Sequence, residues 1–207
     1  MRYHRSLISQ PPKGLVSHWR FDGNVLDSAG YNDGTIHGDP QFVQGVSGQA
    51  LSFDGVDDYV SLGANSFVTG QQNRTFSAWI KPESDTGRII SLGRIDIGMA
   101  WRLWINGGNI RLEIAGSGYT TSLSPTIGEW NFVAATLSGS MLGDHVIYLD
   151  DNVEQCTGSE VVDTAGDYAS IGDIEGGGPA SDKVFHGLID EARIYNRALS
   201  QQEIQNL

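Results

Sequence analysis

The fold is decided by a stretch near the end of the chain, Val184-Phe185-His186-Gly187-Leu188-Ile189-Asp190-Glu191-Ala192-Arg193-Ile194-Tyr195, which has the composition of a β-strand. Alternation with a period of two puts on one face Leu188, Asp190, Ala192 and Ile194, and on the other Ile189, Glu191, Arg193 and Tyr195. Asp190 is therefore expected on the more apolar face. A carboxylate there must be paired, hydrogen-bonded or bound to a metal, because an unpaired buried charge is strongly unfavourable.

The residues after this strand predict a short helical turn at the C-terminus. Ser200-Gln201-Gln202-Glu203 has the pattern of a capping box, and Leu199 and Ile204 are spaced to form a hydrophobic staple.

Length and composition indicate one globular domain of 207 residues that is rich in turns, with 27 glycines against 6 prolines. The net charge of -12 argues against a nucleic-acid partner and favours cations. The single cysteine, Cys156, excludes an internal disulfide. No apolar run is long enough for membrane insertion, so no membrane partner is expected.

Residues 1–13 are expected to form an extended arm or linker, since they are basic and include Pro11-Pro12. They lack the apolar run of a signal peptide. We expect an extracellular or surface-exposed protein, either an excised module or a virion component.

Short alternating runs separated by Gly, Asp and Asn clusters are typical of an all-β fold. The signal Asn106-Gly107-Gly108-Asn109 predicts a hairpin. Because roughly a dozen strands are too many for one compact sheet, two packed antiparallel sheets are expected. The predicted strands span residues 15–21, 35–37, 50–53, 59–62, 75–81, 88–92, 100–105, 110–115, 130–137, 145–149, 169–172 and 184–195.

Five segments, taken together and in order, resemble the laminin G-like modules of the concanavalin A-like lectin/glucanase superfamily. They are residues 14–22 (GLVSHWRFD), 48–60 (GQALSFDGVDDYV), 76–82 (FSAWIKP), 130–134 (WNFVA) and 187–200 (GLIDEARIYNRALS). The resemblance covers residues 14–207 and implies a concanavalin A-like jelly-roll sandwich of two antiparallel sheets, with the short helical turn at its end. It also implies a module that binds glycans or proteins, often with calcium.

Catalysis is not expected. The glucanase branch carries Glu, Asp and Glu alternating on one strand, and we find no such strand. The segment Asp150-Asp151-Asn152-Val153-Glu154 is predicted to lie in a hairpin turn, and Asp173-Ile174-Glu175 has two carboxylates without a third.

The resemblance implies one calcium site, for which the matching positions are Asp22, Asn24, Gly48 and Asp190. Calcium suits this set because it accepts six to eight oxygen ligands, including backbone carbonyls. In the alternative, Asp190 pairs with a cation such as Arg20 or accepts hydrogen bonds from turn amides.

Two further acidic groups are candidate metal sites, and each also has an interpretation without a metal. Asp54, Asp57 and Asp58 either bind a metal or form the turn through their side chains, as acids in tight turns commonly do. Asp173, Glu175 and Asp182 resemble in position the calcium loop of pentraxins, and otherwise form a solvated loop.

Aromatic side chains suggest where a ligand would bind, because aromatic faces stack on sugar rings. Trp101 and Trp104 lie on opposite faces of one predicted strand, so at least one of them is expected to point outward. The predicted ligand-binding residues are Trp101, Arg102, Trp104, Asn106, Tyr119, Asp173, Glu175 and Asp182. In the alternative, both tryptophans pack in the core or at an edge.

These observations predict a non-catalytic, calcium-stabilised carbohydrate-binding module whose partner is a glycan or polysaccharide. The alternative is a virion structural protein, such as a phage head decoration, fiber or tail component, with other virion proteins as partners.

Overall fold

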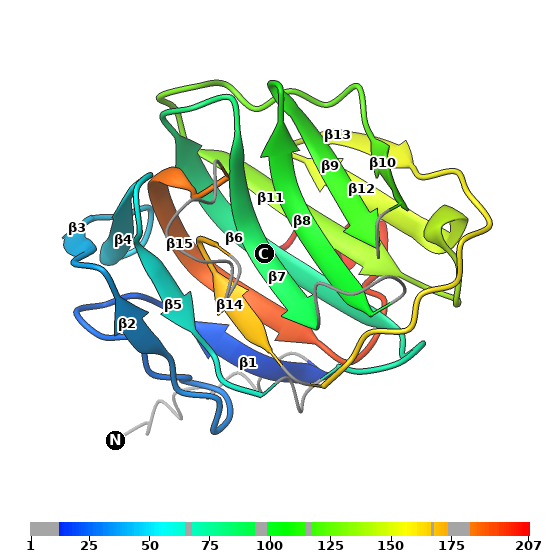
Figure 1. Ribbon diagram of the computed structural model, residues 1–207, viewed down its shortest axis with the longest axis horizontal. Helices are drawn as coiled ribbons and strands as arrows, with labels where there is room; N and C mark the ends of the chain where they lie inside the picture. The colour runs from blue at the N-terminus through cyan, green and yellow to red at the C-terminus, as the bar shows by residue number, and fades with distance from the viewer. Residues whose placement is uncertain (1–12, 65–67, 94–98, 115–116, 167, 174–182) are drawn as a thin grey trace, which may run out of the picture.

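The computed structural model describes residues 13–64, 68–93, 99–114, 117–166, 168–173 and 183–207, and within them it shows the predicted sandwich of two antiparallel sheets (Figure 1). The first sheet contains, in spatial order, β13 (Asn152–Gln155), β12 (His145–Leu149), β11 (Asn131–Leu137), β6 (Arg74–Pro82), β15 (His186–Tyr195), β4 (Gln49–Asp54) and β3 (Gln41–Gln44), with β1 (Leu15–Trp19) also paired to β15. The second contains β10 (Ser117–Thr120), β9 (Asn109–Ile114), β8 (Ala100–Asn106), β7 (Gly87–Gly93), β14 (Ala169–Ile171), β5 (Tyr59–Ser61) and β2 (Thr35–His37). No helix in these ranges is long and apolar enough to cross a membrane.

The main core lies between the two sheets and is built from alternate residues of each strand, as the period of two requires. On β8, for example, Trp101, Leu103 and Ile105 are all fully buried and face this core. The strands β3, β10 and β13 were not predicted, because none of them contains a buried residue and so no apolar alternation marks them in the sequence.

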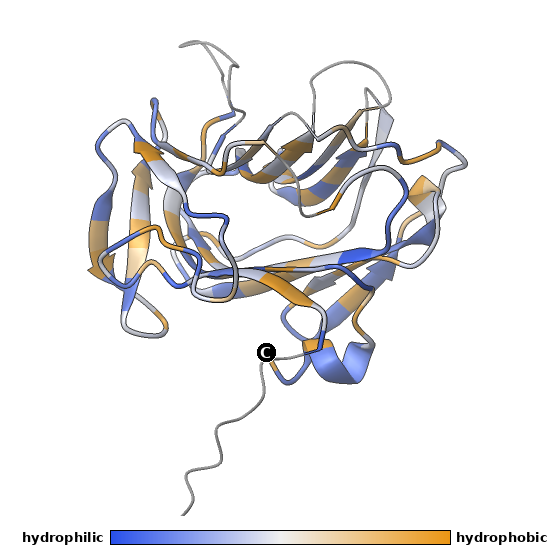
Figure 2. Ribbon diagram, turned by 90° about the horizontal axis from the view of Figure 1, so that it is seen from below, coloured by the Kyte–Doolittle hydropathy of each residue, from blue (hydrophilic) through white to orange (hydrophobic). Residues whose placement is uncertain are grey.

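A second, smaller core lies on the outer face of the eight-stranded sheet, where the C-terminal helix α1 (Gln201–Ile204) packs (Figure 2). The predicted capping box is confirmed, since Ser200 Oγ accepts from the amide of Glu203 and the Glu203 carboxylate accepts from the amide of Ser200. Leu199 and Ile204, the predicted staple pair, are both buried there against Phe132 of β11. An apolar cluster thus fixes the C-terminal helix on one outer face of the sandwich.

A buried histidine links the two sheets. Trp101 Nε1 of β8 donates to His145 Nε2 over 2.9 Å, and His145 Nδ1 lies 2.9 Å from the carbonyl oxygen of Leu142. The two contacts require a neutral ring that carries its proton on Nδ1. Burial lowers the pKa of His145 to about 4.

His145 should therefore make stability pH-dependent. Its folded-state pKa lies below its unfolded value, so between about pH 6.5 and pH 4 the unfolded chain binds a proton that the folded chain does not. Stability should fall by up to roughly 3 kcal/mol as the pH drops through this window. Urea unfolding measured across the window should show this slope, and His145→Gln, which still offers Trp101 an acceptor, should flatten it. An unchanged slope in the variant would contradict the assignment.

Candidate functional site

Strand β15 pairs with two different strands along one of its edges. β4 lies beside its first half, where Ile189 faces Leu51, and β1 lies beside its second half, where Ala192 faces Trp19. At the junction, the three-residue step from Asp190 to Arg193 faces only the two-residue step from Trp79 to Ser77 on β6. β15 therefore carries one extra residue here, which is a β-bulge.

The bulge corrects the predicted faces of β15. Glu191 has a φ of 52°, the left-handed region that L-residues seldom adopt. Ile189 before the bulge faces the same core as Ala192 and Ile194 after it, so Leu188 does not share their face. Strict alternation failed because it assumes a regular strand.

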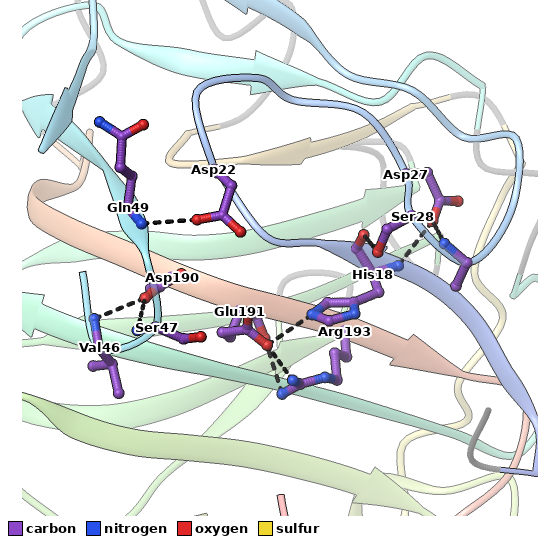
Figure 3. A network of polar contacts seen from close by, with 11 residues as sticks. His18, Asp22, Asp27, Ser28, Val46, Ser47, Gln49, Asp190, Glu191 and Arg193 are labelled. Atoms are coloured by element: carbon purple, nitrogen blue, oxygen red, sulfur yellow. Dashed lines mark hydrogen bonds and ion pairs between the residues drawn. The ribbon is translucent and has the colours of Figure 1, made fainter. Parts of the chain in front are cut away.

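Asp190 is fully buried and faces the turn between β3 and β4 (Figure 3). Its Oδ2 accepts hydrogen bonds from the amides of Val46 at 2.9 Å and Ser47 at 3.1 Å, while its Oδ1 is buried without a partner. Burial raises the pKa of Asp190, and the neighbouring charge of Glu191 adds to the rise against the opposing amide hydrogen bonds. The predicted need for a partner is thus half met, by turn amides.

Asp22 approaches the same turn from the end of the first strand. Its Oδ1 accepts from the amide of Gln49 at 2.8 Å (Figure 3). Only glycine fits at position 48, because its φ is 66° and a Cβ there would lie 2.0 Å from Asp22 Oδ1. A Cβ at Gly45 would similarly lie 2.5 Å from Asp190 Oδ2. The turn is therefore clasped between two carboxylates.

This arrangement fits a hard cation. The carboxylates of Asp22 and Asp190 offer only oxygen atoms, and Asp190 Oδ1 is a buried oxygen without a partner. The carbonyl of Gly48 adds an oxygen that already accepts from the amide of Gly45 and from Gln44 Nε2. Asn24, the fourth predicted ligand, is used locally instead, since its Oδ1 accepts from the amide of Leu26 and its Nδ2 donates to the carbonyl of Asp22. The structure thus brings Asp22, Gly48 and Asp190 to one turn and gives Asn24 a turn-forming role.

Glu191, next to Asp190, ties β15 to β1. Its Oε2 lies 2.8 Å from His18 Nε2 and also pairs with the guanidinium of Arg193 (Figure 3). Burial acts to raise the pKa of Glu191, but the hydrogen bond from His18 and the charge of Arg193 outweigh it, so the pKa lies below its usual value. The strained residue of the bulge is therefore held by an ion pair. This role could not be predicted from the sequence, because the bulge itself was not predicted.

A second cluster lies on the outer face of the seven-stranded sheet, the face turned toward the viewer in Figure 1. One residue from each strand, at positions that alternate with core residues, forms a line across the sheet that we call the polar row. Its members, each paired with the next, are Thr35, Ser61, Ser170, Ser91, Arg102, Glu113 and Gly118. The three serines and the arginine of the row are buried, although they face away from the core.

Arg102 lies in the middle of the polar row and is only 5% exposed. Its Nη1 donates to Glu113 Oε1 over 2.6 Å, but its Nε and Nη2 are buried without partners, as is Ser91 Oγ beside it. Burial lowers the pKa of Arg102, and the nearby Arg88 lowers it further against the opposing effect of Glu113.

Trp104 lies two residues along β8 from Arg102, on the same face. It is 4% exposed, its Nε1 is buried without a partner, and the ammonium of Lys183 lies 4.8 Å from the ring centroid. Its cross-strand neighbours are Arg88 and Arg111, and Arg88 donates to Asp173 Oδ1 over 2.9 Å. The structure thus brings together three predicted ligand residues, Arg102, Trp104 and Asp173.

Two predicted ligand residues belong elsewhere. Trp101 is fully buried in the main core, so its predicted ligand-facing role is wrong. Tyr119 packs against that core and its hydroxyl donates to Glu154 over 2.9 Å, so it does not join Trp104. Asn106 ends β8 at the hairpin turn. Glu175 and Asp182 lie outside the described residues.

The acidic turn after β4 is held by hydrogen bonds. The two oxygens of Asp58 accept from the amides of Asp39 and Asp54, each at 2.9 Å, and Asp54 accepts from the amide of Val56. The carboxylates of Asp54, Asp57 and Asp58 do lie within 4.8 Å of one another. The geometry supports the turn-forming alternative, because the buried member already has two donors.

Sequence reasoning missed Arg88, Ser91, Glu113, Ser170 and Lys183. The signal for several of them was present, since a polar residue alternates with apolar ones at Ser91 on β7 and Glu113 on β9. Such a pattern normally indicates a solvated face, whereas here the face is largely buried.

A family model described as the concanavalin A-like lectin/glucanases superfamily matches residues 54–205 of the chain. Among curated proteins, none matches it.

Solved structures share the fold, and three of them serve as examples. Domain 4 of AbnA, an extracellular GH43 arabinanase from Geobacillus stearothermophilus solved in complex with arabinotriose, is 23% identical with a TM-score of 0.73, and the match covers 93% of this chain and 97% of that one. The binding domain of botulinum neurotoxin serotype G is 16% identical with a TM-score of 0.67, covering 93% of this chain and 50% of that one. Trypanosoma rangeli sialidase, in complex with the inhibitor DANA, is 19% identical with a TM-score of 0.70, covering 95% and 33%.

The Glu191 ion pair predicts a pH-dependent loss of stability. Glu191→Gln removes the charge that Arg193 faces and should lower the free energy of unfolding by roughly 2 to 4 kcal/mol at neutral pH. The folded-state pKa of Glu191 is depressed, so this stabilisation is complete above the unfolded pKa and is lost as the pH falls through the folded one. The difference in the free energy of unfolding between Glu191→Gln and the unaltered protein, measured by urea unfolding, should therefore become smaller in acid. Glu160→Gln, at an exposed position, is the matched control, and its free energy of unfolding should equal that of the unaltered protein.

Proposed function

The chain belongs to the laminin G-like group of the concanavalin A-like lectin/glucanase superfamily, and from that premise we propose that it is a non-catalytic module that binds carbohydrate and is stabilised by calcium. The observation that carries the proposal is the outer face of the seven-stranded sheet. Arg102, Ser91 and Trp104 all hold buried donors there that lack partners. A sugar offers hydroxyl and ring oxygens to such donors and an apolar ring face to the indole.

The related structures support a sugar as the ligand. The arabinanase domain, which matches nearly the whole of this chain, was solved with arabinotriose, and the toxin domain is named for binding. Two carboxylates of the segment 150–154 have structural partners: Asp150 accepts from the amide of Phe132, and Glu154 accepts from Tyr119 and Ser122. This supports a module that binds without turnover.

Calcium would be held by Asp22, the carbonyl of Gly48 and Asp190 Oδ1, the oxygens gathered at the turn between β3 and β4. The ion would be the positively charged partner that the buried carboxylate of Asp190 otherwise lacks. Since Asp190 belongs to the last strand and Asp22 follows the first, calcium would join the two ends of the domain. A role in stability rather than in ligand contact follows, because Trp104 and Arg102 lie on the other sheet.

The calcium site predicts a shift in melting temperature that Asp190→Asn abolishes. The unaltered protein should melt several degrees higher in calcium than in chelator, since binding to the folded state alone stabilises it. Asp190→Asn keeps an oxygen for the amides of Val46 and Ser47 but removes the buried charge, so in chelator it should melt no lower than the unaltered protein.

Differential scanning fluorimetry in calcium and in chelator measures both effects. Asp57→Asn, in the exposed acidic turn, is the matched control and should retain the full calcium shift. Equal melting curves for the unaltered protein in the two buffers would count against the site.

Sugar recognition predicts glycan binding that depends on Trp104. On a glycan array the protein should give saturable binding, and Trp104→Ala should weaken it by at least about tenfold, the scale of a lost stacking contact. Tyr31→Ala, which removes a fully exposed aromatic ring, should leave binding unchanged. If the folded protein binds no glycan and instead assembles with virion proteins, the structural alternative would replace this proposal.

A further inference from the structure

The free edge of the Arg102 guanidinium is shaped for one kind of ligand group. A guanidinium presents its Nε–H and one Nη2–H side by side, as a fork that matches the two oxygens of a carboxylate. In Arg102 these two nitrogens are the ones without partners, while Nη1 is held by Glu113. The ion pair with Glu113 therefore fixes the plane of the guanidinium and leaves its bidentate edge unused.

The surroundings of this edge favour an anion. Among the described residues, the outer face carries four cations in two neighbouring lines, Arg88, Arg102, Arg111 and Lys183. The described carboxylates beside them are Glu113 and Asp173. This described part of the face is more positive than the whole chain, whose net charge is -12. A cluster of like charges disfavours the free protein and is relieved when an anion binds.

The unused donors also carry a free-energy penalty. A buried donor without a partner destabilises the folded protein, and does so more strongly when it is charged. Three such groups adjoin one another here, because Ser91 is the cross-strand neighbour of Arg102 and Trp104 lies two residues along the same strand. Asp190 is the other charged residue left with a buried unpartnered atom in the described chain, and it is explained by the proposed calcium site. A ligand group that accepts from Arg102 and Ser91 beside the Trp104 ring is the corresponding explanation for the outer face.

We propose that this face binds a carboxylate-bearing sugar residue, whose carboxylate accepts from Arg102 Nε and Nη2 and from Ser91 Oγ while its ring lies against Trp104. The proposal rests on the sugar-binding function proposed above and names the class of sugar. Lys183, whose ammonium covers the Trp104 ring, gives way to the sugar ring by rotating its flexible side chain. Uronic acids and sialic acids share this chemistry.

The test compares ligands that differ only in the carboxylate. Binding of an oligogalacturonide is measured against that of its methyl ester by isothermal titration calorimetry, with sialyllactose and lactose as a second pair. The acid of at least one pair should bind roughly 10- to 100-fold more tightly than its neutral partner, the range expected for charge-assisted hydrogen bonds. The pair that shows the preference identifies the source of the carboxylate.

Two substitutions localise the preference. Arg102→Lys keeps the charge but loses the fork, so it should lower the preference to less than about threefold. Lys81→Gln removes a cation from β6 of the other sheet, so it is the matched control and should keep the full preference. Circular dichroism tests whether both variants fold. If Arg102→Lys does not fold, the comparison of acid with neutral ligand in the unaltered protein still tests the proposal.

Each outcome separates this inference from the function it rests on. Equal affinity for acid and neutral ligand, or a preference that survives in folded Arg102→Lys, would overturn the carboxylate site while leaving sugar binding intact. Absence of binding to every glycan tested would overturn both.

Discussion

The fold depends on one extra residue in strand β15. That strand pairs with β4 and then with β1 along a single edge, and the change of partner falls at the bulge at Glu191. The left-handed backbone at Glu191 is strained, and its side chain offsets the strain by pairing with Arg193 and His18. Asp190, the residue before the bulge, faces the turn between β3 and β4. The change of partner and the proposed calcium site therefore lie side by side on one strand.

The sequence predicted much of the fold, because its strands alternate regularly and its helix carries a full capping box at Ser200 and Glu203. It could not reveal the bulge, since no local signal marks Glu191 as left-handed and the constraint comes from β4 and β1. Asp22, Gly48 and Asp190 were identified by family resemblance and lie at one turn. The polar row escaped notice because a serine between apolar residues looks solvated, and its burial depends on distant parts of the chain.

The two outer faces of the sandwich are covered differently. The face of the eight-stranded sheet carries an apolar cluster on which α1 packs, with Leu199, Ile204 and Phe132 buried together, although Ser77 Oγ and the Tyr195 hydroxyl are buried there without partners. The face of the seven-stranded sheet carries the polar row, with unpartnered buried donors at Ser91, Arg102 and Trp104. All of these groups lie outside the main core, so the free-energy penalty of leaving them unsatisfied does not loosen that core.

The two ends of the described chain meet beside the eight-stranded sheet. The carbonyl of Lys13 accepts from Arg197, and the carbonyl of Gly14 accepts from the amide of Asn196. The C-terminus lies on the outer side of that sheet (Figure 2), whereas Arg102 and Trp104 belong to the other sheet. Tethering the domain to a sensor chip through its C-terminus would therefore leave the surface of the seven-stranded sheet facing the solution.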